Sequence, residues 1–134
     1  MTMPDGSVGH AELMIEGSLL MLAEENKEWN SISPTTLGGT SCTLGLYVPD
    51  ADKVFKQAID AGAKEIMPVA DTFYGDRAGA VLDPFGHKWS ISTHKEDIDF
   101  KELQKRADVM FAKIKSPKWV IRGKWFLWIL QTIF

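Results

Sequence analysis

The segment Tyr74-Gly-Asp-Arg-Ala-Gly-Ala-Val-Leu-Asp-Pro-Phe-Gly-His-Lys-Trp-Ser-Ile-Ser-Thr-His94 reads as two strands joined by a tight turn. The predicted strands run from Arg77 to Leu82 and from Lys88 to Thr93. Between them, Asp83-Pro-Phe-Gly86 has the composition of a turn, because proline presets one turn dihedral angle and glycine tolerates positive φ. This segment is therefore expected to form a β-hairpin.

The residues before this hairpin predict the rest of one folding unit. Thr40 to Val48 has strand character, Asp50 is a good N-cap for a following helix, and Gly62 ends that helix. The helix carries an apolar stripe made of Val54, Phe55, Ala58 and Ile59. Lys64 to Val69 is expected to be the next strand. The order strand, helix, strand, strand, strand is one complete βαβββ module.

Short motifs in this region resemble those of a known superfamily. Tyr74-Gly-Asp-Arg77 and Asp83-Pro-Phe-Gly-His87, followed by Trp89 and Thr93-His-Lys-Glu-Asp97, resemble the second half of the vicinal oxygen chelate proteins, and their PhnB-like branch in particular. That superfamily includes glyoxalase I, extradiol dioxygenases and bleomycin-resistance proteins. The resemblance spans roughly residues 4 to 115. It implies an α+β fold in which two βαβββ modules each curl a sheet into half of an open barrel around a ligand pocket.

The first of these two modules is expected to be incomplete. His10 to Ile15 and Ser18 to Ala23 predict two strands around a Glu16-Gly17 turn, with Ala11, Leu13 and Ile15 facing the core or a helix. The strand and helix that precede this hairpin in the family are not recognised, because residues 1–6 resemble the family's mid-module loop. A sheet that lacks a strand exposes backbone donors and apolar surface. We therefore expect a homodimer, with exchange of elements between its chains as one option.

The remaining segments set the domain limits. The polar residues 24–39, with Pro34, Gly38 and Gly39, predict a long loop, and Asp99 is expected to cap a helix to Lys115. Residues 1–117 are thus expected to form one domain, followed by a Trp-rich apolar tail at 118–134. Three interpretations of the tail stay open: a cover for the incomplete half or a second chain, an interfacial membrane anchor, or a sequence not selected for this fold.

Composition restricts the class of protein. With 134 residues, 45% hydrophobic and 25% charged, the chain is expected to be one soluble domain. A net charge of −3 disfavours nucleic acid as a partner. The apolar run in the tail is shorter than the roughly 20 residues that a membrane-spanning helix needs. The N-terminal residues carry no basic leader, so we expect no signal peptide. A single cysteine, Cys42, excludes an internal disulfide, fits the cytoplasm, and is expected to be a buried strand residue.

Metal chemistry is disfavoured by the residues at the family's ligand positions. Glyoxalase-type members hold a divalent metal with four inner-sheet ligands, and the resemblance places three of these positions at Thr43, Ser90 and near Met21. None of the three is a good metal ligand. No cofactor is therefore expected. The alternative is a displaced divalent metal site made of His10, Glu12 and His94.

A ligand pocket without metal is the leading expectation. Strand alternation points Thr43 and Tyr47, and separately Ser90 and Ser92, toward the concave face of the sheet. His10 and Glu12 share one face of the first hairpin, and Tyr74 and Arg77 come from the Tyr74-Gly-Asp-Arg77 motif. Arg77 either clamps an anionic group or pairs with a nearby acid. Asp76 is a possible general base that lacks an evident partner. The predicted ligand-binding residues are His10, Glu12, Thr43, Tyr47, Tyr74, Arg77, Ser90 and Ser92.

Three functions compete on this basis. The first is sequestration of a small organic molecule, similar to the bleomycin-resistance members that hold a drug between two subunits. The second is a metal-dependent glyoxalase-type lyase or related enzyme with displaced metal ligands. The third is a relict that binds nothing. Whether the protein is an enzyme is left open by the sequence.

Overall fold

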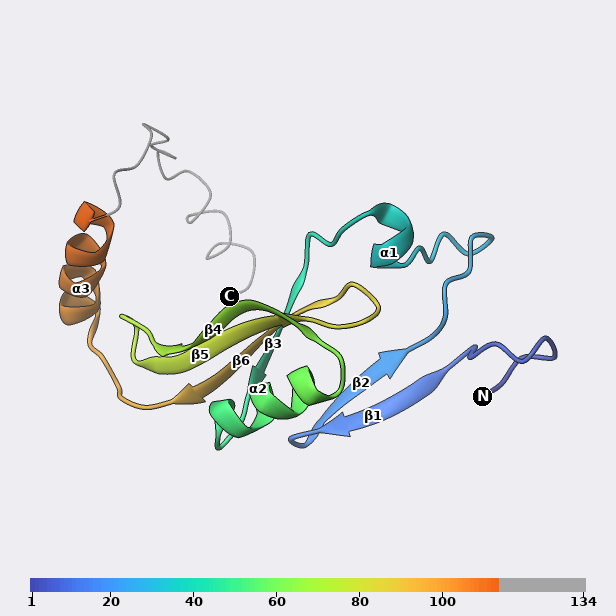
Figure 1. The fold of residues 1–134 in the computed structure, drawn as a ribbon, viewed down its shortest axis with the longest axis horizontal. Coiled ribbons are helices and arrows are strands. Elements are labelled where there is room, and N and C mark those ends of the chain that lie inside the picture. The colour runs from blue at the N-terminus through green and yellow to red at the C-terminus, as the bar shows by residue number, and fades with distance from the viewer. Residues whose placement is uncertain (114–134) are drawn as a thin grey trace, which may run out of the picture. The chain divides into compact units, whose positions relative to one another are not determined.

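The computed structural model of the chain describes residues 1–113 (Figure 1). Contacts between residues divide the chain after Ile98 into two units, which are described separately. The first unit contains a two-stranded sheet, a short helix and a four-stranded sheet with its own helix. The second unit begins at Asp99, and its described part is one helix.

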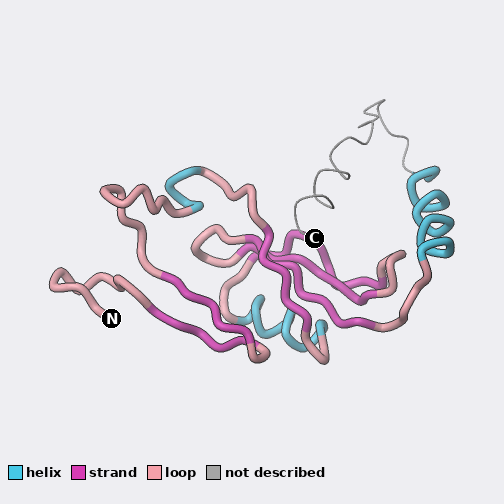
Figure 2. The backbone as a smooth tube through the Cα atoms, turned by 180° about the vertical axis from the view of Figure 1, so that it is seen from behind, coloured by secondary structure: helices cyan, strands magenta, loops and turns pink. Residues whose placement is uncertain are grey.

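The four-stranded sheet and its helix form the predicted βαβββ module. Its elements are β3 (Thr43–Tyr47), α2 (Ala51–Asp60), β4 (Lys64–Asp71), β5 (Asp76–Leu82) and β6 (Lys88–His94). The strand order is β3-β6-β5-β4, with β3 parallel to β6 and the other two pairs antiparallel. Figure 2 shows the strands in magenta and the helices in cyan. The mixed α+β fold expected from the sequence is confirmed. The boundaries differ at β3, which begins three residues later than predicted, and at β4, which continues to Asp71.

One side chain organises the turn between β5 and β6. Asp83 Oδ1 accepts hydrogen bonds from the backbone N–H groups of Phe85 and His87, both at 2.9 Å. Its other oxygen, Oδ2, accepts a bond from Trp89 Nε1 at 3.0 Å. Gly86 has φ +88°, a conformation that glycine adopts without strain. The predicted hairpin is therefore confirmed, and it is held by an aspartate that bonds to its own turn.

The core lies between α2 and one face of the four-stranded sheet. Asp50 caps the helix, since its side chain accepts a bond from the Lys53 N–H at 3.0 Å. The predicted apolar stripe of α2 packs on the sheet, where Gly79 leaves room for Phe55: a Cβ on this glycine would lie 2.9 Å from the Phe55 ring. The buried apolar cluster consists of Val48, Ala51, Phe55, Val81 and Ile91.

The N-terminal hairpin forms a separate two-stranded sheet of β1 (Ala11–Ile15) and β2 (Ser18–Leu22). Glu16 and Gly17 both have positive φ, +47° and +78°, as the predicted two-residue turn requires. The expectation that Leu13 meets the core is wrong, because its side chain is 47% exposed. The loop that follows also differs from prediction: Ser33 caps a one-turn helix, α1 (Pro34–Leu37), in which Pro34 occupies a favourable first position.

The second unit contains α3 (Phe100–Lys113). Asp99 caps it as predicted, accepting a bond from the Glu102 N–H at 2.9 Å. The predicted end of this helix at Lys115 and the tail at 118–134 lie outside the described residues. Within residues 1–113, no helix has the length and apolar character that crossing a membrane requires. Cys42 also departs from expectation: it is exposed and precedes β3.

Candidate functional site

The two faces of the four-stranded sheet differ in composition. On β3, Leu44 and Leu46 point toward α2, while Thr43, Gly45 and Tyr47 are exposed on the other side, as strand alternation predicts. On β6, Trp89 and Ile91 pack against α2, so the intervening residues belong to the opposite face. We call this opposite face the site face. It carries Thr43, Gly45, Tyr47, Asp76, Ala78, Ala80, Leu82, Lys88, Ser90, Ser92 and His94.

Tyr47 crosses a neighbouring strand on the site face. Its backbone pairs with Ser92 of β6, yet its phenol O–H donates to Asp76 Oδ2 of β5, the strand beyond, at 2.5 Å. The side chain therefore spans β6, in keeping with the burial of Ser92. The bond to Asp76 raises the pKa of Tyr47, with burial as the second cause. The phenol consequently keeps its proton, while 62% of the residue stays exposed.

Asp76 is a buried carboxylate with two side-chain partners. It is 5% exposed, and beside the bond from Tyr47 its Oδ1 accepts one from His94 Nδ1 at 3.0 Å. Asp76 and His94 are directly opposite each other in the β5–β6 register. A buried carboxylate costs free energy unless it is hydrogen-bonded, and here both of its oxygens are satisfied.

His94 lies between two carboxylates. Its Nε2 is 3.0 Å from Asp97 Oδ1, in addition to the Nδ1 bond to Asp76. The Asp76 hydrogen bond, followed by the Asp97 bond, raises the pKa of His94 and favours the imidazolium, in which both ring nitrogens donate. Tyr47, Asp76, His94 and Asp97 form the cluster that we call the Tyr47 network.

Tyr74 is also close to this network. It lies in the β4–β5 turn, and its phenol is one of the groups that raise the pKa of Tyr47. Its ring packs edge-to-face on Phe73, with ring centroids 5.2 Å apart. The structure thus brings five of the predicted ligand-binding residues to one region or face: Thr43, Tyr47, Tyr74, Ser90 and Ser92.

Arg77 belongs to the other face of the sheet. Its Nε and Nη2 donate to the two carboxylate oxygens of Asp52 on α2, at 2.6 and 2.8 Å, and Nη1 donates to Asp71 at 3.1 Å. Of the two roles considered from the sequence, the structure shows the ion pair with nearby acids. The fork geometry joins α2 to β5 and leaves Arg77 apart from the Tyr47 network.

His10 and Glu12 form a pair of their own at the N-terminal hairpin. The His10 Nε2 and Glu12 Oε1 atoms are 3.0 Å apart. Within residues 1–113, no three side chains of the kind that bind metals gather closely enough to hold an ion. The displaced site considered from the sequence would need His10, Glu12 and His94 together, whereas His94 is engaged by Asp76 and Asp97.

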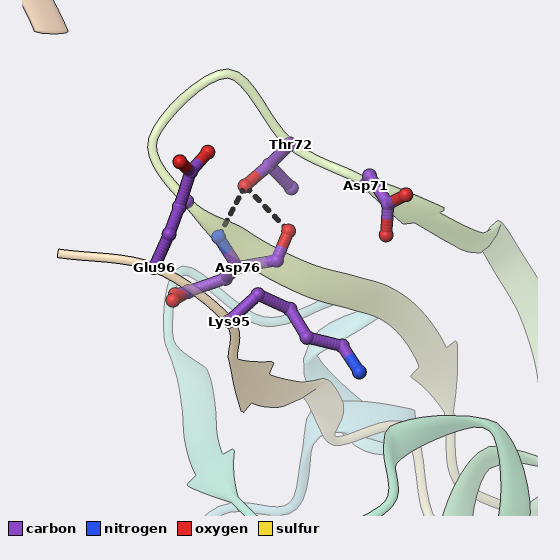
Figure 3. A pocket seen from close by; sticks show the side chains of 6 residues that line it. Asp71, Thr72, Asp76, Lys95 and Glu96 are labelled. Atoms are coloured by element: carbon purple, nitrogen blue, oxygen red, sulfur yellow. Dashed lines mark hydrogen bonds between the residues drawn. The ribbon is translucent and has the colours of Figure 1, made fainter. Parts of the chain in front are cut away.

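A polar hollow lies at the end of the β4–β5 hairpin. It has a volume of about 370 Å³ and is lined by Asp71, Thr72, Gly75, Asp76, Lys95 and Glu96. Figure 3 shows the Thr72 hydroxyl bonded to the backbone N and O of Asp76. Asp71 connects this hollow to the α2 side, since it pairs with Arg77. The hydrogen bond from Arg77 is the main cause that lowers the pKa of Asp52 on α2, and the charge of Lys95 adds a minor contribution. The hollow and the Tyr47 network are therefore different features that share Asp76.

Sequence reasoning missed the partners of Asp76. The pairing of Asp76 with His94 could have been found from the spacing in the hairpin. Asp76 precedes the turn segment Asp83–His87 by as many residues as His94 follows it. An antiparallel register places such positions opposite each other. The bond from Tyr47 has no comparable signal, since it depends on a side chain that reaches across a strand.

Comparisons with known proteins identify a protein family and several relatives that resemble this chain. The Glyoxalase/Bleomycin resistance protein/Dioxygenase superfamily matches residues 2–91. The uncharacterized protein Mb0911c of Mycobacterium bovis is 40% identical over 104 residues, which is 75% of this chain and 68% of that protein. The chain spans 61% to 68% of the length of the curated relatives that it matches.

Solved structures agree on the fold. TioX from Micromonospora sp. ML1 is 26% identical, with a TM-score of 0.51 over 74% of this chain and 78% of that one. A glyoxalase/bleomycin resistance protein/dioxygenase from Nocardioides is 18% identical, with a TM-score of 0.52 over 75% and 68% of the two chains. At 18% identity, the Nocardioides structure supports the fold alone.

Proposed function

The chain belongs to the glyoxalase/bleomycin resistance protein/dioxygenase superfamily, and from this premise we propose that it binds a small organic molecule on its site face. Within the superfamily we place it in the PhnB-like branch, on the motifs Tyr74–Arg77 and Asp83–His87. The proposed role is sequestration rather than metal-assisted turnover.

The observation that supports this proposal most directly is the fixed aromatic ring on a polar sheet face. Tyr47 is largely exposed, yet its hydroxyl is anchored in a buried carboxylate. The hydroxyls of Thr43 and Ser90 lie further along the same sheet face. Binding sites for small molecules combine apolar or aromatic surface with a few well-placed polar groups, and a side chain that is already fixed loses little entropy on binding.

The donor set on the site face does not suit the divalent metal that the family often carries. Thr43 and Ser90 of the site face offer neutral hydroxyls, and Met21, on the separate β1–β2 hairpin, offers a thioether, all poor partners for Zn²⁺ and related ions. The better donors of the site face, Asp76 and His94, bind each other. We therefore derive no metal-dependent step for this protein.

We further propose that the protein works as a homodimer. The β1–β2 hairpin exposes large apolar side chains on both of its faces: Leu13, Met14, Leu19, Met21 and Leu22. A two-stranded sheet is marginally stable alone, and exposed apolar surface of this kind is typical of an interface. A second copy, with or without exchange of the hairpin, would cover it.

The exposed thiol of Cys42 is compatible with a reducing compartment such as the cytoplasm.

The proposal is tested by the metal content and mass of protein purified without a histidine tag, followed by a ligand screen on the metal-free protein. We expect a dimer that contains far less than one divalent ion per chain and binds organic molecules on the site face. A stoichiometric metal ion whose removal abolishes ligand binding would instead favour the lyase. A monomer that binds nothing in the screen would favour the relict.

A further inference from the structure

We propose that His94 is a pH-operated latch, which holds Asp97 to the end of the four-stranded sheet and drives it away when the ring loses its proton. This inference goes beyond the proposed function and does not depend on a ligand. Three observations support it: a carboxylate on each ring nitrogen, the unequal burial of these two carboxylates, and a backbone anchor that keeps Asp97 next to the ring.

Each ring nitrogen of His94 faces a carboxylate. Nδ1 is 3.0 Å from Asp76 Oδ1, and Nε2 is 3.0 Å from Asp97 Oδ1. An ionised carboxylate only accepts hydrogen bonds, so both contacts are hydrogen bonds only when both nitrogens carry a proton. A neutral imidazole has one N–H and can satisfy one of the two carboxylates. The two contacts together therefore require the imidazolium.

The two carboxylates differ in burial, and this difference decides which bond is lost. Asp76 is 5% exposed, whereas the side chain of Asp97 is fully exposed. Water can replace the histidine as a donor to Asp97, but a buried carboxylate that loses its donor is left unsatisfied. Asp76 therefore keeps the remaining N–H of the neutral ring, and this fixes the tautomer with the proton on Nδ1.

That tautomer turns the second contact from attractive to repulsive. With the proton on Nδ1, the unprotonated Nε2 presents a lone pair to Asp97 Oδ1 at the distance of a hydrogen bond. Two acceptors at this distance repel each other. The loss of one proton from His94 therefore does more than remove a bond, because it pushes the carboxylate of Asp97 away from the ring.

The backbone keeps Asp97 within reach of the ring in both states. The N–H groups of Lys95 and Glu96 both donate to the Gly75 carbonyl, at 3.0 and 3.1 Å. These bonds involve no titratable group, so they do not change with the charge of His94. Asp97 is the next residue, and the second unit begins two residues later. The latch thus acts on the short stretch between a fixed backbone anchor and the start of the second unit.

The direction of the switch follows from the groups around the ring. The titratable groups on the neighbouring segments are Tyr47 of β3, Tyr74 of the β4–β5 turn, Asp76 of β5, and Lys95, Glu96 and Asp97 after β6. Tyr47 donates to the other oxygen of Asp76 and so acts on His94 through that carboxylate. The Asp76 bond, followed by the Asp97 bond, raises the pKa of His94 above 6.5. The latch is therefore closed below this raised pKa and opens as the pH rises through it.

An NMR titration of the full chain across the His94 transition tests the latch. Ring ¹⁵N shifts report which nitrogen is protonated, and ¹⁵N relaxation reports the order parameter of the Asp97 amide. At high pH we expect a neutral ring with its proton on Nδ1. The Asp97 order parameter should fall from about 0.85 towards about 0.6, with the same midpoint as the ring. A neutral ring protonated on Nε2, or an Asp97 amide that ignores the titration, would overturn the proposal.

Two variants separate the latch from a general effect of pH. In Asp97→Asn the side chain offers both a donor and an acceptor, so it can bond to Nε2 in either state and should abolish the change in order parameter. His87→Gln alters another exposed histidine of the same hairpin and should leave the change intact. A change that persists in Asp97→Asn would contradict the latch, as would its loss in His87→Gln. The tautomer is measured on the unaltered chain, so that result does not depend on whether a variant folds.

Discussion

Tyr47 donates its phenolic proton to Asp76 at 2.5 Å although the two residues lie on strands that are separated by β6. This bond fixes the ring on the site face and satisfies one oxygen of a carboxylate that is 5% exposed. The same bond therefore links the stability of the sheet to the shape of the proposed binding surface.

Loss of this bond should destabilise the fold. Tyr47→Phe removes the hydrogen bond that Asp76 Oδ2 accepts from the Tyr47 hydroxyl, and an unsatisfied buried acceptor costs about 1–3 kcal/mol. Urea denaturation of the variant should show this reduction in the free energy of unfolding. The matched control is Tyr74→Phe on a half-exposed tyrosine, for which we expect a change within about 0.5 kcal/mol. Equal effects of the two substitutions would contradict the role given to the Tyr47 hydroxyl.

The pKa of His94 should lie above its ordinary value of 6.5, with Asp76 as the main cause and Asp97 as the second. NMR titration of the His94 ring measures it directly. Asp76→Asn should lower this pKa more than Asp97→Asn does, because the Asp76 bond makes the larger contribution. A pKa at or below 6.5 in the unaltered chain would contradict the network.

The same pKa shift fixes how stability depends on pH. Because the folded state binds the His94 proton more tightly than the unfolded state, the stabilisation is fully present below the unfolded pKa and is lost as the pH rises through the folded pKa. The difference in unfolding free energy between the unaltered chain and His94→Gln should therefore shrink with rising pH above 6.5. A difference that grows over this range would show that the sign is wrong.

Two glycine substitutions separate a strained position from an open one. Gly75 has φ +92°, and a Cβ there would lie 2.5 Å from the Glu96 carbonyl oxygen, so Gly75→Ala should cost about 1–3 kcal/mol or more. Gly45→Ala meets no atom within 4 Å and should change stability by less than about 1 kcal/mol, in the stabilising direction. Thermal melts of both variants test this contrast. On the site face, the added methyl of Gly45→Ala should still weaken ligand binding.

The proposed dimer depends on the β1–β2 hairpin. Replacing Leu19 and Met21 by lysine puts charge on one exposed apolar face of this hairpin and should convert the dimer to a monomer in light scattering. Lysine at the exposed Phe85, in the turn of the other hairpin, is the control that should stay dimeric. An unaltered chain that is monomeric at high concentration would remove the basis for this prediction.

The sequence was sufficient for the module because its signals are local. Asp50 before α2, Asp83 to Gly86 between β5 and β6, and the Glu16-Gly17 turn each act within a few residues. Strand alternation likewise placed Thr43, Tyr47, Ser90 and Ser92 on one face. The site was harder to predict because it depends on contacts across strands. Arg77 and Asp76 are adjacent in sequence, but alternation sends one to α2 and the other to the site face.

The exposed apolar hairpin illustrates another limit. Leu13 has the pattern of a core residue, and nothing in a single sequence indicates whether its cover comes from the same chain. The short helix α1 was missed for a different reason. Pro34 lies in a polar segment that predicts a loop, although proline at the first position of a helix, after a Ser33 cap, favours helix formation.

The most direct test of the proposed function is an NMR titration of the metal-free full chain with a library of small organic molecules, followed through amide shifts. We predict that at least one compound shifts the amides of Gly45, Tyr47, Ser90 and Ser92, and that these shifts are lost in Tyr47→Leu but kept in Arg77→Lys, which alters the opposite face. Shifts confined to the Asp71–Glu96 hollow or to the β1–β2 hairpin, or binding that appears only after a divalent metal is added, would contradict the account.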